Sequence, residues 1–156
     1  LGADLGRLPL SLPLPVADLA EDAKAALLEA ADGHGVALAV HAEDQIEALA
    51  NWIDELTLPA LGAAVDPAIL LAGKYDVSAA VGTLGNRLLV ARLSDYRFSE
   101  AQRCPVGTGQ LDLLAYRVAL DLGRGRRGPV VLDLRGLNDP LSVAAAAAIA
   151  WQKATF

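Results

Sequence analysis

Four short, mostly apolar runs constrain the fold of this sequence more than any other feature. They cover residues 36–40, 61–65, 88–93 and 129–134, and segments with helical spacing of apolar residues separate them. A continuous apolar run of this length is typical of a strand that is buried on both faces. Strands that alternate with helices form a parallel sheet with right-handed crossovers. The sequence therefore predicts an α/β fold.

Helices are predicted between and after these runs, over residues 18–32, 44–53, 78–84, 111–122 and from Asp139-Pro140 onward. Gly33 and Gly35 end the first of them, and Asp44 is the expected N-cap of the second. Residues 8–14 are short, apolar and interrupted by proline, which indicates a strand end that leads into a loop. Residues 94–109 are predicted to form a long polar loop.

Two architectures match this alternation: a doubly wound sheet and a (β/α)8 barrel. Both place functional residues at the carboxyl ends of the strands. No Gly-x-Gly-x-x-Gly motif follows any predicted strand, and the nearest match, Gly107-Thr108-Gly109, comes after the long polar loop. The sequence therefore gives only a weak nucleotide-binding signal.

Composition excludes several classes of protein. The chain is 54% hydrophobic and 21% charged, which is a globular composition, and its net charge of −6 argues against a nucleic-acid partner. No apolar run is long enough to predict a membrane span. The lone Cys104 is typical of a reducing compartment, so a cytoplasmic location is expected. Arg124, Arg126 and Arg127 lie in a Gly-rich turn and are interpreted as a solvated loop.

Polar side chains follow each of the four predicted strands. They are His41 and Glu43, then Asp66, then Arg92 and Asp95, and finally Asp133 and Arg135. In a barrel these side chains converge over the mouth. The alternative interpretation is that they end apolar strands and cap helices, and that His41 is a structural histidine.

Five segments resemble, in order and at matching spacing, segments of the xylose-isomerase-like TIM-barrel family of sugar phosphate isomerases and epimerases. They are residues 35–41 (Gly-Val-Ala-Leu-Ala-Val-His), 61–67, 87–95, 105–112 (Pro-Val-Gly-Thr-Gly-Gln-Leu-Asp) and 128–135 (Gly-Pro-Val-Val-Leu-Asp-Leu-Arg). The resemblance implies that residues 1–156 form a single domain, the C-terminal portion of a (β/α)8 barrel with roughly strands 4–8. The missing N-terminal part would belong to a longer protein or to a partner chain.

The resemblance also implies a chemistry. In this family a divalent metal, Mn²⁺ or Mg²⁺, is held at the strand ends, and two glutamates move a proton next to a carbonyl of a sugar or sugar phosphate. On this implication, His41 and Asp133 stand at the catalytic positions, and His41, Asp66 and Asp133 at metal positions. Arg92, Asp95 and Arg135 are the expected substrate-binding residues.

The sequence departs from the family pattern at several of these positions. His41 stands where the pattern has glutamate, Asp133 is one methylene shorter than the second glutamate, and Arg92 replaces a metal ligand. A guanidinium keeps its proton at ordinary pH and cannot coordinate a metal. Arg92 is instead expected to pair with Asp66 or Asp133, so the metal site is predicted to be weakened or absent.

Two functions follow as hypotheses. The first is a sugar isomerase or epimerase that acts in carbohydrate metabolism by metal-assisted proton transfer. The second is a non-catalytic relative with a decayed metal site, in which Arg92, Asp66, Asp133 and Asp95 form a salt-bridge network and the protein serves as a binding or structural module. The acidic balance and the lack of clustered histidines argue against the related endonuclease branch of this superfamily.

Overall fold

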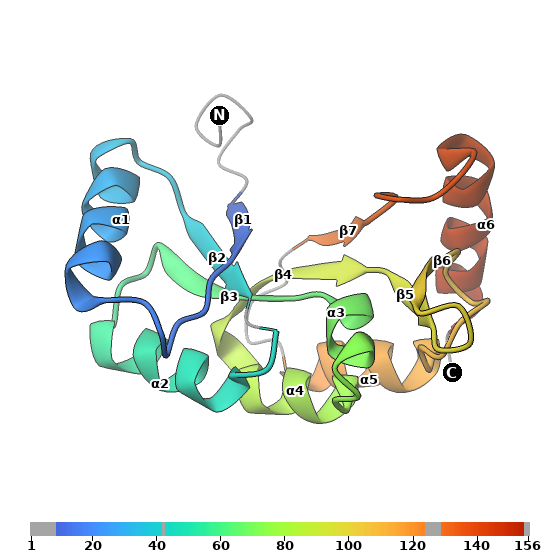
Figure 1. The fold of residues 1–156 in the computed structure, drawn as a ribbon, viewed down its shortest axis with the longest axis horizontal. Helices are drawn as coiled ribbons and strands as arrows, with labels where there is room; N and C mark the ends of the chain where they lie inside the picture. The colour runs from blue at the N-terminus through green and yellow to red at the C-terminus, as the bar shows by residue number, and fades with distance from the viewer. Residues whose placement is uncertain (1–8, 42, 124–128, 155–156) are drawn as a thin grey trace.

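The computed structural model describes residues 9–41, 43–123 and 129–154. Five strands form one parallel sheet in the order β1-β2-β3-β4-β7 (Figure 1). They are β1 (Leu10–Pro13), β2 (Leu38–His41), β3 (Leu61–Val65), β4 (Leu88–Leu93) and β7 (Val130–Leu132). Each strand lies beside the strand that precedes it in this sheet, without the reversal of order that marks a doubly wound sheet. The architecture is therefore a partial (β/α)8 barrel, and the doubly wound alternative was wrong.

Helices cover the convex face of the sheet, as Figure 1 shows for α1, α2, α4 and α5. The helices are α1 (Glu21–Gly33), α2 (Ile46–Leu56), α3 (Pro67–Ala72), α4 (Val77–Leu84), α5 (Leu113–Gly123) and α6 (Pro140–Lys153), with a 3₁₀ turn, η1, at Gly85–Arg87. The main hydrophobic core lies between these helices and the outward-facing side chains of the strands. Its most deeply buried members include Val40, Leu49, Ala63, Val81, Leu84, Leu88, Ala91, Tyr116 and Leu120.

The concave face of the sheet carries a different set of side chains. Ala39, Ala64 and Val90 form a small separate apolar cluster there. Because side chains alternate along a strand, Arg92 follows Val90 onto the same face, and His41 follows Ala39. The concave face is thus apolar in the middle of the strands and polar at their carboxyl ends.

Most of the predicted elements are present with shifted ends. The strands over 61–65 and 88–93 have the predicted bounds, and the helices over 18–32 and 111–122 begin two or three residues later than predicted. Helix α2 begins at Ile46 with Gln45 as its N-cap, so the capping role predicted for Asp44 was wrong. The basic cluster of Arg124, Arg126 and Arg127 lies outside the described residues.

Helix α3 and a β-hairpin were not predicted. Helix α3 follows β3 directly, with Pro67 in its first turn. The predicted loop over 94–109 contains an antiparallel pair, β5 (Asp95–Arg97) and β6 (Gln102–Cys104), in which Asp95 pairs with Cys104. This hairpin extends from the carboxyl end of β4 (Figure 1), so it stands at the edge where the functional side chains were expected.

No helix in the described part of the chain is both long and apolar enough to cross a membrane.

Candidate functional site

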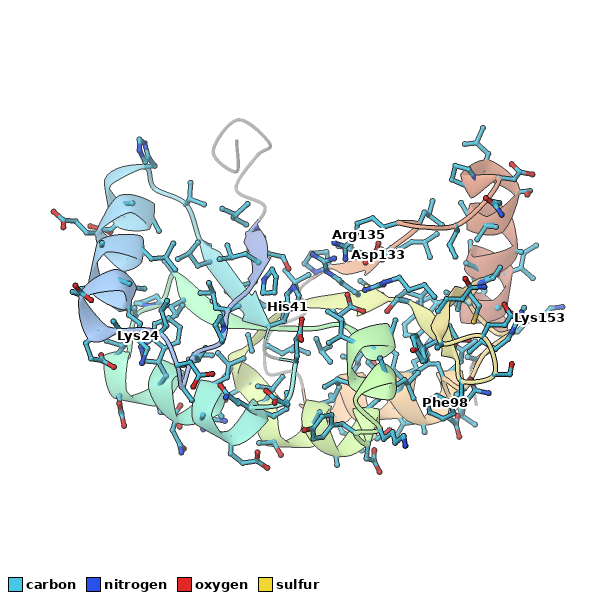
Figure 2. The ribbon with its side chains drawn as sticks, viewed as in Figure 1. Lys24, His41, Phe98, Asp133, Arg135 and Lys153 are labelled. Carbon is cyan, nitrogen blue, oxygen red and sulfur yellow. The ribbon has the colours of Figure 1, made fainter. Side chains whose placement is uncertain are left out.

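The carboxyl ends of the strands bring together two aspartates and three arginines, which we call the rim cluster: Asp66, Asp133, Arg92, Arg103 and Arg135. Figure 2 shows the labelled side chains of His41, Asp133 and Arg135 at the concave side of the sheet. The convergence follows from the parallel sheet, because the carboxyl ends of all five strands meet at one edge. The cluster combines residues that are far apart in the sequence.

Asp66 is held rigidly just after β3. It is 2% exposed, and its Oδ1 accepts a hydrogen bond of 2.7 Å from the Ser94 hydroxyl. Ser94 Oγ in turn accepts the backbone N–H of Ala68 at 3.0 Å, which ties β4 to the start of α3. The other oxygen, Oδ2, lies 2.8 Å from Arg103 Nη2 and 3.8 Å from Arg92 Nη1. Oδ1 of Asp66 thus binds the Ser94 hydroxyl within the fold, and Oδ2 contacts guanidinium groups.

Asp133 is the centre of the rim cluster. Its Oδ2 lies 3.0 Å from Arg92 Nη1, 3.2 Å from Arg103 Nη1 and 2.5 Å from Arg135 Nη2. Burial by itself would raise the pKa of Asp133, but hydrogen bonds from Arg135 and Arg92 and the positive charge of Arg103 hold that pKa well below its usual range. Asp133 is therefore ionised at neutral pH.

Arg103 is a member of the cluster that sequence reasoning missed. It lies in β6, and the fold of the hairpin directs it across the mouth of the barrel, where it contacts both Asp66 and Asp133. Side chains alternate between the two faces of the strand Gln102-Arg103-Cys104. Because Cys104 is buried on one face, Arg103 points to the opposite face. This alternation can be inferred only once residues 102–104 are known to form a strand.

Asp95 does not belong to the rim cluster, contrary to its place in the predicted salt-bridge network. Its side chain is buried and accepts four backbone N–H groups, those of Tyr96, Gly107, Gly109 and Leu111, at 2.8–3.1 Å. A Cβ on Gly109 would lie 2.4 Å from Asp95 Oδ1, so only glycine fits there. Asp95 therefore organises the Gly107-Thr108-Gly109 loop behind the hairpin, and its contact with a substrate stays a prediction.

His41 ends β2 on the concave face and is 3% exposed. Neither ring nitrogen has a hydrogen-bond partner among the described residues. Burial, followed by the positive charge of Arg92, lowers the pKa of His41 from its ordinary value of 6.5 to about 4, and Arg135 and Arg103 act in the same direction. The imidazole is therefore neutral at pH 7, with one N–H donor and one acceptor nitrogen that are both unmatched.

The donor set at the rim does not fit a divalent cation. Among the described residues, no three His, Cys, Asp or Glu side chains are placed to hold a metal ion together, and the metal role predicted for His41, Asp66 and Asp133 stays a prediction. The oxygens that would face a metal are in contact with guanidinium groups instead. At about 4 Å and an effective dielectric constant of about 20, each guanidinium would repel a divalent cation by roughly 8 kcal/mol.

Comparison with known proteins shows the fold. No protein-family model matches the sequence, and no curated protein sequence matches it significantly. Among solved structures, the xylose isomerase domain protein from Planctomyces limnophilus is similar to it, with a TM-score of 0.70 and 22% identity over 85% of this chain. The fold is a xylose isomerase-like barrel.

Two further solved structures share this barrel. The 3-keto-D-glucoside 4-epimerase YcjR from E. coli matches with a TM-score of 0.68 and 16% identity over 92% of this chain and 63% of its own. The IOLI protein with a bound zinc atom matches with a TM-score of 0.62 and 17% identity over 85% of this chain. The chain spans about half the length of two of these proteins, 51% of the P. limnophilus protein and 52% of IOLI.

The xylose isomerase-like barrel thus places five of the six predicted site residues together. His41, Asp66, Arg92, Asp133 and Arg135 meet at the rim, and Asp95 lies behind it. The pairing expected of Arg92 with Asp66 and Asp133 is present. The catalytic, metal-binding and substrate-binding roles assigned to these residues stay predictions.

We expect His41 to make stability depend on pH between about 4 and 6.5. Because its pKa falls to about 4 on folding, the unfolded chain binds more protons in this range, and the free energy of unfolding decreases as pH falls. The full effect is up to roughly 3 kcal/mol. Urea denaturation of His41→Phe across pH 4–7 should show a flattened dependence. His34→Asn, in an exposed turn, is the control, and an unchanged slope in His41→Phe would contradict the prediction.

Asp95→Asn should destabilise the protein by roughly 2–4 kcal/mol, because an amide has one acceptor oxygen and directs its NH₂ at backbone N–H groups. Urea denaturation measures the loss. Asp112→Asn is the matched control, since Asp112 accepts one exposed N–H, that of Ala115, and should cost much less. If Asp95→Asn keeps full stability, Asp95 is not a loop organiser, and its predicted contact with substrate gains support.

Proposed function

We propose that this chain is part of a non-catalytic binding protein that is built on the barrel of sugar isomerases and epimerases and holds a small sugar-like molecule without a metal ion. One observation carries the proposal: the Oδ2 atoms of Asp66 and Asp133 are both in contact with Arg92 and Arg103. In a metal-dependent barrel these carboxylates would direct their oxygens at the cation.

The buried position of the carboxylates supports this interpretation. The side chains of Asp66 and Asp133 are 1% and 4% exposed, and a buried carboxylate requires a compensating positive charge. A divalent cation can supply that charge, but here arginine does so permanently, because the guanidinium does not lose its proton. The guanidiniums donate hydrogen bonds and offer no Lewis acid for proton transfer next to a carbonyl.

The neighbouring cavities support a small-molecule ligand. One cavity of about 370 Å³ lies on the concave face and is bounded by Ser11, Val90, Arg92, Asp133 and Arg135, among others. A second cavity of about 430 Å³ lies beside the hairpin and is bounded by Glu43, Tyr75, Tyr96 and Arg103, among others. Both volumes lie in the range of small-ligand sites.

The proposal predicts that the protein does not bind Mn²⁺ in calorimetry at neutral pH. Replacing two of the three guanidiniums that contact Asp66 and Asp133, in Arg92→Gln/Arg103→Gln, should create weak Mn²⁺ binding, because the two buried carboxylates lose most of their compensating charge. Arg87→Gln is the control, since Arg87 pairs with Asp54 away from the rim and its loss should leave Mn²⁺ binding absent.

Stoichiometric Mn²⁺ binding by the unaltered protein, abolished in Asp66→Ala, would overturn the proposal. It would favour instead a metal-assisted sugar isomerase or epimerase with His41 and Asp133 as its catalytic residues. Thermal melts of each variant establish that loss of binding does not reflect loss of folding.

We further propose that additional strand–helix units close the barrel, supplied by a preceding segment of a longer protein or by a partner chain. Strands β1 and β7 each have one neighbour in the sheet. Apolar side chains are also exposed on β7 and on the helix that follows it: Val131 on β7 is 46% exposed, and Leu141 and Ile149 on α6 are 84% and 52% exposed. Unpaired edges next to apolar surface favour association with more chain.

Sedimentation velocity of the 156-residue chain should therefore show concentration-dependent association. Charges at the exposed apolar sites, in Val131→Lys/Ile149→Lys, should reduce it because a buried lysine is costly. Leu122→Lys is the control, since Leu122 is 83% exposed and belongs to α5, which lies on the convex face of the sheet (Figure 1). A chain that stays monomeric at every concentration, with a sharp thermal transition, would contradict this second proposal.

A further inference from the structure

The cavity of about 430 Å³ beside the hairpin is bounded by charges of opposite sign that do not pair with each other. Glu43 and Asp44, in the loop between β2 and α2, bound it together with Arg103 of β6. Arg103 forms its ion pairs with Asp66 and Asp133 instead. Neither Glu43 nor Asp44 has an ion pair or a hydrogen bond with another described residue. Carboxylates and a guanidinium therefore bound one space without direct contact.

Arg103 keeps donors for a further acceptor. Its Nη1 and Nη2 donate to Asp133 and Asp66, but a guanidinium carries five N–H groups. The side chain of Arg103 is 24% exposed, so part of it is accessible. The rim cluster as a whole has three guanidinium groups and two carboxylates, which leaves one positive charge without a counterpart inside it. A carboxylate that enters the cavity supplies that counterpart.

The rest of the lining is apolar or aromatic. It consists of Ala68, Ile69, Ala72, Gly73, Tyr75 and Tyr96. The Tyr75 ring lies directly against Gly73, where a Cβ would be 2.7 Å from the ring atoms Cδ2 and Cε2. The Tyr96 ring is in edge-on contact with Phe98, with 5.9 Å between the ring centroids. Each ring is thus held by a neighbour, and both offer a surface to an apolar group.

We infer that this cavity binds a small zwitterion, an α-amino acid with an apolar side chain. Its carboxylate contacts Arg103, its ammonium group contacts Glu43 and Asp44, and its side chain lies against α3 and the two tyrosine rings. An α-amino acid carries both charges within a few bonds of each other, so it bridges groups of opposite sign that do not reach one another. The cavity volume lies in the range of small-ligand sites.

The charges of the cavity favour this ligand over a sugar. An uncharged sugar would leave Glu43 and Asp44 without a counterpart, and a sugar phosphate would bring a further negative charge close to both carboxylates. The inference goes beyond the proposed function, because it adds a ligand of another chemical class at the cavity beside the hairpin.

Calorimetry with matched compounds tests the inference, at pH 6, below the pKa of α-amino groups, and with EDTA present. L-Phenylalanine is compared with L-phenylalaninamide, which lacks the carboxylate, and with 3-phenylpropanoate, which lacks the ammonium group. L-Leucine is compared in the same way with L-leucinamide and 4-methylpentanoate. At least one of the two amino acids should bind about tenfold more tightly than both of its derivatives. If neither amino acid binds, or if the derivatives bind equally tightly, the inference is overturned.

A pair of double variants tests the ammonium site. Glu43→Gln/Asp44→Asn should weaken binding of the amino acid by about fivefold, because each ion pair is exposed, and should leave binding of the compound without an ammonium group unchanged. Glu29→Gln/Asp32→Asn is the matched control, since it removes the same charge from α1, outside the cavity. Equal losses in the two double variants would reduce the effect to net charge and reject this site for the ammonium group.

Arg103→Gln tests the carboxylate site. The amino acid and its amide should then bind equally tightly, because the group that distinguishes them is gone. A folded Arg103→Gln protein that still prefers the amino acid would reject the assignment. Arg103 also pairs with the buried Asp66 and Asp133, so thermal melts establish folding first, and the matched compounds and the Glu43/Asp44 variants decide the inference without this variant.

Failure of this inference can be distinguished from failure of the proposed function. Stoichiometric Mn²⁺ binding by the unaltered protein would reject the proposed function, and it would leave amino acid binding in EDTA as it is. Absence of amino acid binding, with Mn²⁺ binding also absent, would reject the zwitterion inference alone.

Discussion

The parallel pairing of strands that are buried on both faces is the constraint on which the rest of this structure depends. Continuous apolar runs such as residues 61–65 cannot face water on either side, so helices must cover one face and the barrel interior the other. Right-handed crossovers then add each new strand beside the last one. As a result, the polar residues at the carboxyl ends of the strands all lie at the same edge of the sheet. Asp66, Arg92 and Asp133 therefore meet there, although 67 positions separate the first from the last.

The chemistry of that edge follows from burial rather than from the fold. Asp66 and Asp133 are nearly inaccessible to water, and the cost of burying two carboxylates must be offset locally. A metal ion and a group of arginines are two different solutions of the same electrostatic problem. The metal provides a point charge with open coordination positions, whereas arginine provides a spread charge with directed N–H donors. The same barrel can therefore hold carboxylates stably and yet lose the chemistry of a Lewis acid.

Sequence patterns predicted the elements whose signals are local. The strands over residues 61–65 and 88–93 were recognisable because each is a short run made up mostly of apolar residues, and α5 because its apolar residues recur at helical spacing. The hairpin of β5 and β6 had no such signal. Its strands are three residues each and polar, and their pairing depends on Asp95, which binds backbone groups of the following loop.

The same distinction explains which site residues were found. His41, Asp66, Arg92 and Asp133 stand at the ends of recognisable strands, so topology alone brought them together. Arg103 required the hairpin, and the hairpin required the tertiary role of Asp95, which the sequence pattern had associated with the substrate instead. An aspartate beside a glycine-rich loop can bind a ligand or bind the backbone N–H groups of the loop. Only the positions of those N–H groups in the structure distinguish the two roles.

His41 shows why the electrostatics of the rim favour a ligand over a closed ion-pair network. A network that served stability alone would be expected to satisfy every buried polar atom, since each unmatched atom weakens the fold. Ser94 meets that expectation, because its hydroxyl both donates to Asp66 and accepts from Ala68. His41 does not, and the arginines beside it make protonation of the imidazole unfavourable, so it cannot gain a partner by pairing with a carboxylate as a cation. The partner that it lacks therefore lies outside the described residues, in a bound small molecule or in the further strand–helix units that are proposed to close the barrel.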